Sequence, residues 1–267
     1  MKRFLSIMAV FIAIGLLGQS CTTVPLTGRK QVNLLPESEL ISMGLKNYSE
    51  FLKENPPSGD AAGSAMVKEV GNNLAAAVIK YFADNNIPGR LEGYKWEFNL
   101  VENKEANAWC MPGGKVVVYN GILPLTADKN GLAVVISHEI AHAVARHGNE
   151  RMSQQLIAQM GGIALGEALK TKPQETQNIF LSVYGLGSQV GILLPYSRQH
   201  ELEADRLGLI FMAMAGYDPQ SAVSFWERMS SYSGAKPPEF LSTHPSDATR
   251  ISRIKAAIPE AMKYYRR

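Results

Sequence analysis

Two histidines four residues apart, with a glutamate directly after the first, are the strongest chemical signal in the chain. They lie in residues 132–148, LAVVISHEIAHAVARHG, where apolar residues recur at helical spacing. On such a helix, His138 and His142 project from one face, one turn apart, so both imidazoles can bind one metal ion. Glu139 is rotated by about 100° from His138 and can reach a water at the metal without being a ligand. The pattern predicts two metal ligands and a general base on a helix that ends near Gly148.

The alternative is that this short pattern arose by chance and that the histidines are ordinary core residues. The apolar flanks of the segment predict that the helix is buried. Two histidines and a glutamate buried without a metal would be costly. A metal site is therefore the preferred interpretation.

A second motif supplies a candidate for the third ligand. Residues 196–208 read YSRQHELEADRLG, and the apolar residues that follow predict a helix ending near Gly216. Glu201 and Asp205 lie four apart on one face of it. Glu201 can be the third protein ligand of a zinc ion, and Asp205 can accept the second N–H of a ligand histidine. The alternative is a solvated helix face on which these acids pair with Arg198 and Arg206.

The two motifs together, HEIAHAVARH and SRQHELEAD, resemble the zinc metallopeptidase family that contains the HtpX-type proteases and the CAAX prenyl proteases. The resemblance extends to NAWCMPGGKVVVYNGIL at residues 107–123, which is similar to the family's strand before the active-site helix. VPLTGRKQ at residues 24–31 and STHPSDATRI at residues 242–251 resemble segments of its exported bacterial lipoprotein members. Two features depart from the family: Cys110 stands where small or apolar residues are commoner, and no transmembrane helices flank the motifs.

The resemblance implies one Zn²⁺ per chain and a role for each matching residue. The implied zinc ligands are His138, His142 and Glu201, the implied catalytic residue is Glu139, and Asp205 is implied to support a ligand histidine.

Two further residues are candidates for the site. His244 precedes a predicted helix capped by Ser246. We expect it to steady the transition state, to fill the open zinc position in a resting form, or only to pack in its loop. Arg250 is predicted to form a salt bridge or to bind a substrate carbonyl.

An extended substrate is expected to pair antiparallel with the strand at residues 116–119, which makes Val116 and Val118 substrate-binding residues. The remaining histidines and acids are expected to lie outside the site. His147 is predicted to be structural, His200 to be exposed or bonded locally, and Glu203 to be solvated or structural.

The start of the chain predicts export. Residues 1–20, MKRFLSIMAVFIAIGLLGQS, combine a basic start at Lys2 and Arg3 with an apolar run that is too short to span a membrane, as in a signal peptide. Small residues before Cys21 resemble a lipidation site, although the usual leucine is displaced to Leu17. The alternatives are an ordinary signal peptide or an uncleaved anchor. We expect a periplasm-facing lipoprotein at the outer membrane, in which Cys110 has no disulfide partner.

Composition bounds the fold class. The chain has 267 residues, of which 46% are hydrophobic and 19% charged, which excludes intrinsic disorder. A net charge of only +3 gives no case for nucleic-acid binding. The predicted class is α+β: a mainly helical single domain with a small antiparallel-type sheet beside the HExxH helix. Patterning predicts helices at residues 37–52 and 62–82, strands at 94–100 and 115–119, and helices after 120.

We expect three parts along the chain: a signal peptide at 1–20, a lipidated tether at 21–34 and a metallopeptidase domain at 35–267. Glycines among the apolar residues of 153–195 suggest a lid over the site.

The expected function is a zinc endopeptidase that cleaves unfolded or misassembled envelope proteins. The alternatives are a non-catalytic zinc lipoprotein that acts as a chaperone or scaffold, and a metal-dependent hydrolase of other substrates. An open zinc position favours the enzyme, whereas a closed site with His244 as fourth ligand favours the non-catalytic protein.

Overall fold

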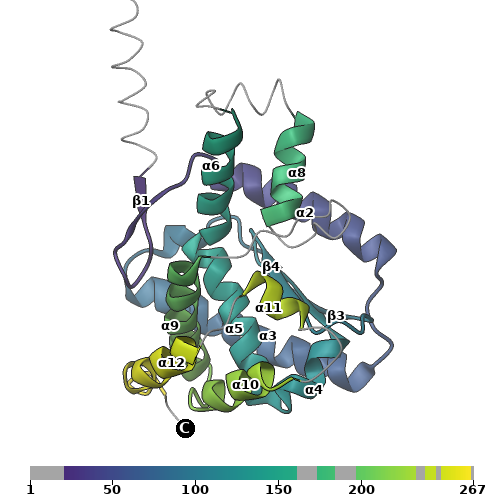
Figure 1. Ribbon diagram of the computed structural model, residues 1–267, viewed down its shortest axis with the longest axis vertical. Coiled ribbons are helices and arrows are strands. Elements are labelled where there is room, and N and C mark those ends of the chain that lie inside the picture. Colours follow the sequence, from purple (N-terminus) through teal and green to yellow (C-terminus); the bar gives the residue numbers. More distant parts are fainter. Residues whose placement is uncertain (1–20, 161–172, 184–196, 233–237, 245–247, 266–267) are drawn as a thin grey trace, which may run out of the picture.

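The computed structural model describes residues 21–160, 173–183, 197–232, 238–244 and 248–265. The predicted signal peptide and Ser246 lie outside these ranges, and so does much of the predicted lid. The helices named below are α2 (Glu37–Glu54), α3 (Ala61–Asp84), α4 (Leu123–Thr126), α5 (Lys129–Ala145), α6 (His147–Met160), α8 (Pro173–Val183), α9 (Arg198–Met214), α10 (Ser221–Ser230), α11 (Glu239–Thr243) and α12 (Ala248–Ala261). The strands are β1 (Cys21–Thr23), β2 (Lys30–Val32), β3 (Glu97–Val101), β4 (Ala108–Met111) and β5 (Lys115–Tyr119). Figure 1 shows their arrangement, and the predicted α+β class is confirmed.

The helices α2 and α3 match the two predicted in the first half of the chain. Asp60 caps α3 by accepting a hydrogen bond from the amide of Gly63, which satisfies one of the free donors at the helix start. The predicted strand at 94–100 is shorter than expected, because pairing begins only at Glu97. The predicted strand at 115–119 is confirmed as β5.

The sheet beside the HExxH helix is mixed. Its strand order is β3-β5-β4. The β4–β5 pair is antiparallel, as expected for a hairpin, whereas β3 and β5 run parallel. The strand β5 therefore lies between β3 and β4, and both of its edges are paired.

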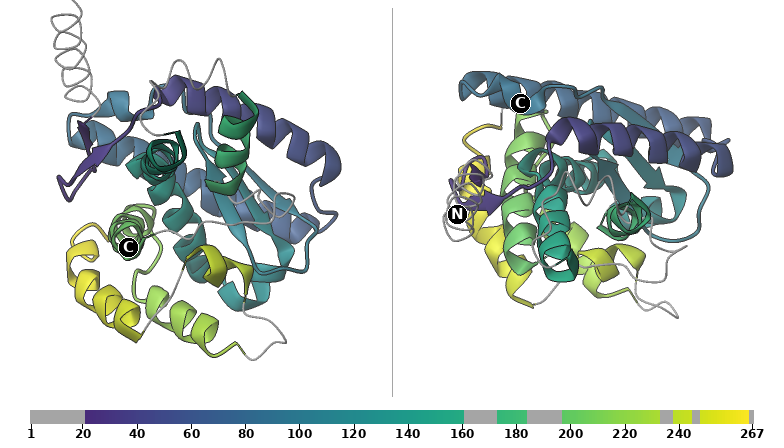
Figure 2. Two further views of the ribbon diagram at one scale, coloured as in Figure 1. Left: turned by 45° about the horizontal axis from the view of Figure 1, so that its top comes forward. Right: turned by 90° about the horizontal axis from the view of Figure 1, so that it is seen from above.

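The helix α5 is the centre of the molecule. Every residue from Gly131 to Ala145 is buried, and the helix packs against α3, α9, α10 and β4. Gly208 of α9 allows that helix to approach α5 closely, because a Cβ there would lie 3.2 Å from the backbone of Ser137 and His138. The helix α3 packs with Val116 and Val118 of β5, whereas α2 packs with Val117 and Tyr119, so the two helices cover opposite faces of the sheet. Figure 2 shows both helices from two further directions.

The predicted end of this helix at Gly148 is wrong. Arg146 adopts a left-handed conformation (φ 62°, ψ 32°) and ends α5 at Ala145. The helix α6 then starts at His147 and includes Gly148. This break redirects the chain and turns His147 back toward the site.

The segment after Cys21 packs on the body of the protein. The strands β1 and β2 form an antiparallel hairpin, and Val24 is 1% exposed. Gln31 donates a hydrogen bond from Nε2 to the carbonyl of Ala145 at 2.9 Å, and the amide of Leu34 donates to Oγ of Ser153 at 2.8 Å. The division into a tether and a domain at residue 34 stays a prediction.

Within the described ranges, no helix combines the length and the apolar character that crossing a bilayer requires.

Candidate metal centre

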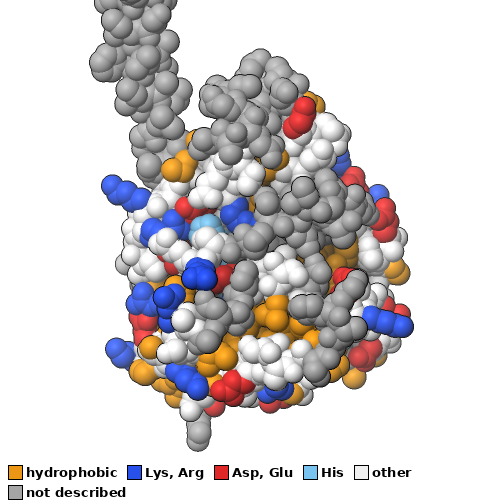
Figure 3. Space-filling model, in the orientation of Figure 1, with side chains coloured by type: hydrophobic (Ala, Val, Ile, Leu, Met, Phe, Trp, Pro, Cys, Tyr) orange, Lys and Arg blue, Asp and Glu red, His pale blue; other side chains and the backbone are white. Residues whose placement is uncertain are grey.

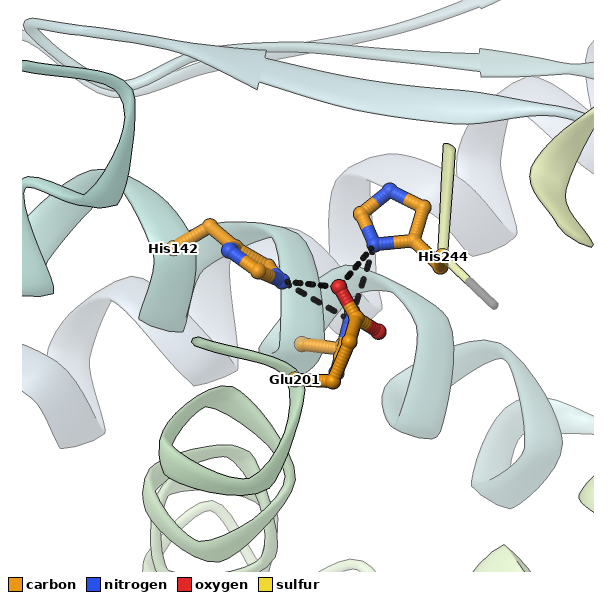
Figure 4. A group of neighbouring side chains, drawn as sticks. His142, Glu201 and His244 are labelled. Carbon is orange, nitrogen blue, oxygen red and sulfur yellow. Dashed lines mark hydrogen bonds and ion pairs between the residues drawn. The ribbon is translucent and has the colours of Figure 1, made fainter. Parts of the chain in front are cut away.

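Four side chains from three elements converge on one buried point. His138 and His142 come from α5, Glu201 from α9 and His244 from the C-terminal end of α11. One ligand atom from each lies within 4.8 Å of the others. Each residue is 2% exposed. Figure 4 shows the rings of His142 and His244 pointing at the carboxylate of Glu201. The structure thus brings together the three predicted ligands and adds His244 to them.

The distances suit a shared cation. Nε2 of His138 lies 3.0 Å from Nε2 of His142 and 3.2 Å from Nδ1 of His244. Oε1 of Glu201 lies 3.3 Å from Nε2 of His142 and 3.1 Å from Nδ1 of His244. Imidazole nitrogens and a carboxylate oxygen are the donors that zinc prefers in proteins. Lone pairs so close together repel unless a cation lies between them, so this donor set fits Zn²⁺.

Carboxylates behind the rings fix which nitrogen faces the centre. Oδ1 of Asp205 lies 3.0 Å from Nδ1 of His138, as predicted. Because a carboxylate only accepts, Nδ1 carries the proton and Nε2 is left to bind the metal. Oε1 of Glu139 lies 3.3 Å from Nε2 of His244, and Nδ1 of that ring faces the centre.

Arg250 belongs to this support and not to a substrate surface. Its guanidinium donates to both oxygens of Asp205 at 2.8 Å and lies 2.8 Å from Oε2 of Glu201. It also lies over the ring of Trp226, 3.6 Å from the centroid, and is 3% exposed. The predicted salt bridge is therefore present. The predicted substrate-binding role is wrong for this conformation, because the buried guanidinium is committed to the two carboxylates.

The solvated-face alternative for the α9 acids is also wrong. Glu201 is 2% and Asp205 is 7% exposed, and both face Arg250 of α12. Arg206, the proposed partner on their own helix, instead pairs with Glu260 at 2.6 Å.

The electrostatics of the centre follow from burial and close charges. Burial raises the pKa of Glu139. Burial opposes ionisation of Glu201 too, but His244 and Arg250 hold its pKa well below the ordinary value. Burial also lowers the pKa of His138, yet Asp205 and Glu201 outweigh it and raise that pKa to about 9.

Glu139 lies at the centre without being part of the ligand group. Its side chain is 4% exposed, and Oε1 has no hydrogen-bond partner of good geometry in the described ranges. Burial, and after it the charge of Glu139, raises the pKa of the Cys110 thiol on β4, the strand that packs against α5. A carboxylate so placed is available to accept a proton.

The predicted substrate contacts of Val116 and Val118 are wrong. Both residues are 0% exposed and lie on the central strand β5, whose two edges already pair with β3 and β4. A substrate strand cannot be added to β5. Local patterning predicted the strand but not its place in the sheet.

A second group of polar residues lies behind His142, and no local pattern in the sequence predicts it. His147 and Glu203 are buried and bonded to one another, so Glu203 is structural and not solvated. His200 is 3% exposed and its Nε2 lies 3.0 Å from Oε2 of Glu150 on α6, which corrects the expectation of an exposed or locally bonded ring. Arg29 completes the group. In the sequence, Arg29 lies in the VPLTGRKQ segment, which resembles segments of the family. That resemblance gave no role for Arg29.

A buried pair of histidines from an HExxH helix, joined by a glutamate from a second helix, defines the class as zinc metallopeptidase. The model of the family "Peptidase family M48" matches residues 64–258, and the chain belongs to that family.

Several curated metalloendopeptidases are similar to the chain. Mitochondrial metalloendopeptidase OMA1 of Saccharomyces cerevisiae is 37% identical over 190 residues, which cover 68% of this chain and 52% of the relative. OMA1 of Schizosaccharomyces pombe is 40% identical over 169 residues, 62% of this chain and 48% of the relative. The beta-barrel assembly-enhancing protease of Escherichia coli is 26% identical over 264 residues, 92% of this chain and 51% of the relative. In these three comparisons the chain spans about half the length of the relative.

Proposed function

We propose that the protein is a zinc endopeptidase in which Glu139 is the general base. The observation that carries this proposal is the place of Glu139, a buried carboxylate beside the His138, His142 and Glu201 group that is not itself in that group. A purely structural zinc site needs four ligands and has no use for such a carboxylate.

The residues divide the chemistry between them. His138, His142 and Glu201 would hold Zn²⁺, which when bound supplies Lewis acidity that polarises the scissile carbonyl and activates a water. Glu139 accepts a proton from that water on its carboxylate and passes it to the leaving amine. Asp205 and Arg250 keep His138 and Glu201 in place, with contacts of 2.8–3.0 Å.

The conformation described is a resting form in this proposal. Nδ1 of His244 stands among the ligand atoms, and its Nε2 lies 3.3 Å from Oε1 of Glu139. One ring therefore occupies the position that catalysis needs open and also engages the base. His244 must move away before a substrate can bind.

The proposed substrates are unfolded or misassembled proteins of the cell envelope. With β5 excluded, β4 is the edge strand that packs against α5, the helix of Glu139, and an extended chain can pair with it. Main-chain pairing of this kind is weakly selective for sequence. Figure 3 shows hydrophobic side chains gathered low on the face that carries α10 and α11, a surface suited to exposed apolar segments. The printed name of the Escherichia coli relative, a beta-barrel assembly-enhancing protease, supports envelope substrates.

A specific observation favours a second candidate, a non-catalytic zinc protein that acts as a chaperone or scaffold. Three histidines and one glutamate form a complete four-residue set, which is typical of a structural site. The position of Glu139 favours the enzyme over this alternative. The two differ in whether removal of the His244 ring opens an active site or only weakens metal binding.

The proposed location is the periplasmic face of the outer membrane, with a lipid on Cys21. The basic start and apolar run of residues 1–20 and the small residues before Cys21 support this. Mass spectrometry of the N-terminal peptide from a bacterial membrane fraction tests it, with a diacylated Cys21 expected. A free thiol at Cys21 would refute lipidation.

Cleavage of unfolded casein before and after chelation tests the proposed activity. The native protein is expected to cleave casein, to lose that activity in a zinc chelator and to regain it when zinc is restored. Cleavage that survives complete removal of zinc would refute the proposal.

A further inference from the structure

A chain of buried hydrogen bonds leads away from zinc ligand His142. Nδ1 of His142, the nitrogen that faces away from the centre, lies 3.0 Å from Nδ1 of His147. Nε2 of His147 in turn lies 3.1 Å from Oε2 of Glu203. His147 is 0% and Glu203 is 5% exposed, so water cannot substitute for these contacts.

Arg29 closes this chain from the N-terminal segment. Its Nε and Nη2 donate to the two oxygens of Glu203, each at 2.9 Å. Its Nη1 and Nη2 donate to the two oxygens of Glu150, each at 2.7 Å. Thr27 adds a hydrogen bond from Oγ1 to Oε1 of Glu203 at 3.0 Å. One guanidinium thus holds two carboxylates from α6 and α9 in a fixed geometry.

The donors and acceptors can be assigned along this chain. The carboxylate of Glu203 only accepts, so Nε2 of a neutral His147 carries the proton. Nδ1 of His147 then has a lone pair and accepts from Nδ1–H of His142. Nε2 of His142 is left unprotonated and faces the metal position. Asp205 orients His138 directly, whereas Glu203 orients His142 through one intervening ring.

Arg29 is what keeps Glu203 in this role. Glu150 and Glu203 share one guanidinium and are 6% and 5% exposed. Without a cation between them, two buried carboxylates would repel one another and leave their positions. A displaced Glu203 no longer accepts from His147 and so no longer specifies the proton position on that ring.

We propose that Arg29 is a positioning residue for zinc ligand His142 and acts through Glu203 and His147. The segment that follows Cys21 then supports the metal centre through Arg29. The proposal rests on the zinc site alone and does not require the protein to be a peptidase.

The test compares zinc affinity in apoprotein of the full chain by competition with a chromophoric chelator. Arg29→Gln is expected to bind zinc about tenfold more weakly than the wild type, as for other residues that support a metal ligand. The matched control is Arg206→Gln on α9, which breaks another two-bonded arginine–glutamate pair, with Glu260 at 2.6 and 2.7 Å. This control is expected to bind zinc like the wild type.

A second readout reports the proton position itself. In ¹⁵N-labelled apoprotein, the imidazole of His142 is expected as the Nδ1–H tautomer, and Arg29→Gln is expected to show a mixture of tautomers. A merely structural arginine would alter the thermal melt without altering this spectrum. If Arg29→Gln does not fold, Glu203→Gln decides, with the same losses expected. Wild-type zinc affinity and tautomer in either folded variant would overturn the proposal.

Discussion

Nε2 of His244 lies 3.3 Å from Oε1 of Glu139, while Nδ1 of the same ring lies 3.1 Å from Oε1 of Glu201. A single side chain therefore bridges the proposed base and the zinc ligands. We therefore expect the activity to depend on the position of the His244 ring.

Removing that ring is expected to increase activity. His244→Ala leaves His138, His142 and Glu201 as three protein ligands, which is the usual number in a catalytic zinc site, and it frees Glu139. Initial rates on unfolded casein are expected to rise severalfold over the wild type, with zinc retained. The exposed Lys129→Gln, which breaks a surface pair with Glu69, is expected to leave the rate unchanged. A lower rate in His244→Ala would instead mean that His244 assists the reaction.

Weakening the support of His138 is expected to weaken zinc binding. Asp205→Asn keeps the shape of the side chain but removes the charge that lies 3.0 Å from Nδ1 of His138 and two charge-assisted bonds with Arg250. Substitution of such partners lowers metal affinity by about 10–100-fold. Competition with a chelator measures this. Unchanged affinity would show that Asp205 does not orient the ligand.

The Arg29 cluster is expected to make the protein sensitive to acid. Burial raises the pKa of Glu150, but hydrogen bonds with Arg29 and His200 outweigh burial and lower this pKa to about 2. A carboxyl with a lowered pKa in the folded state contributes its full stability above its unfolded pKa, near 4.5, and loses it as the pH falls toward 2. Denaturant unfolding of the apoprotein is expected to show this loss between pH 4.5 and 2. Glu150→Gln should show a shallower dependence in that window, and an equal slope would contradict the assignment.

A methyl group added at Gly208 is expected to destabilise the contact between α5 and α9. A Cβ there would meet backbone atoms of Ser137 and His138 at 3.2 Å, so the facing backbone must give by a few tenths of an ångström. Overpacking of this kind costs about 1–3 kcal/mol. Gly208→Ala is expected to lower the melting temperature. Gly89→Ala is the control, because a Cβ there meets nothing within 4 Å. Equal melting temperatures would contradict the close approach.

The ligands could be predicted from the sequence because each pair lies on one helix at a fixed spacing. His138 with His142, and Glu201 with Asp205, are separated by one helical turn, and the turn alone puts them on a common face. The role of His244 stayed open among several, since nothing local in the sequence shows that the end of α11 reaches the ring of His138.

The residues that were missed depend on contacts across the chain. Arg29 meets Glu150 and Glu203, which are 121 and 174 residues away, and neither spacing leaves a local pattern. His147 was placed outside the site because the helix was expected to continue to Gly148. The left-handed Arg146 turned the chain instead. The order of the strands was likewise beyond local patterning, so β5 was taken for an edge.

The most direct test of the central claim compares the native protein with Glu139→Gln for casein cleavage and zinc content in the same preparations. Both preparations are expected to hold about one zinc ion per chain, because Glu139 is not a ligand. The cleavage rate is expected to fall by several orders of magnitude only in the variant. Full turnover by a zinc-loaded Glu139→Gln protein would contradict the claim that Glu139 is the base.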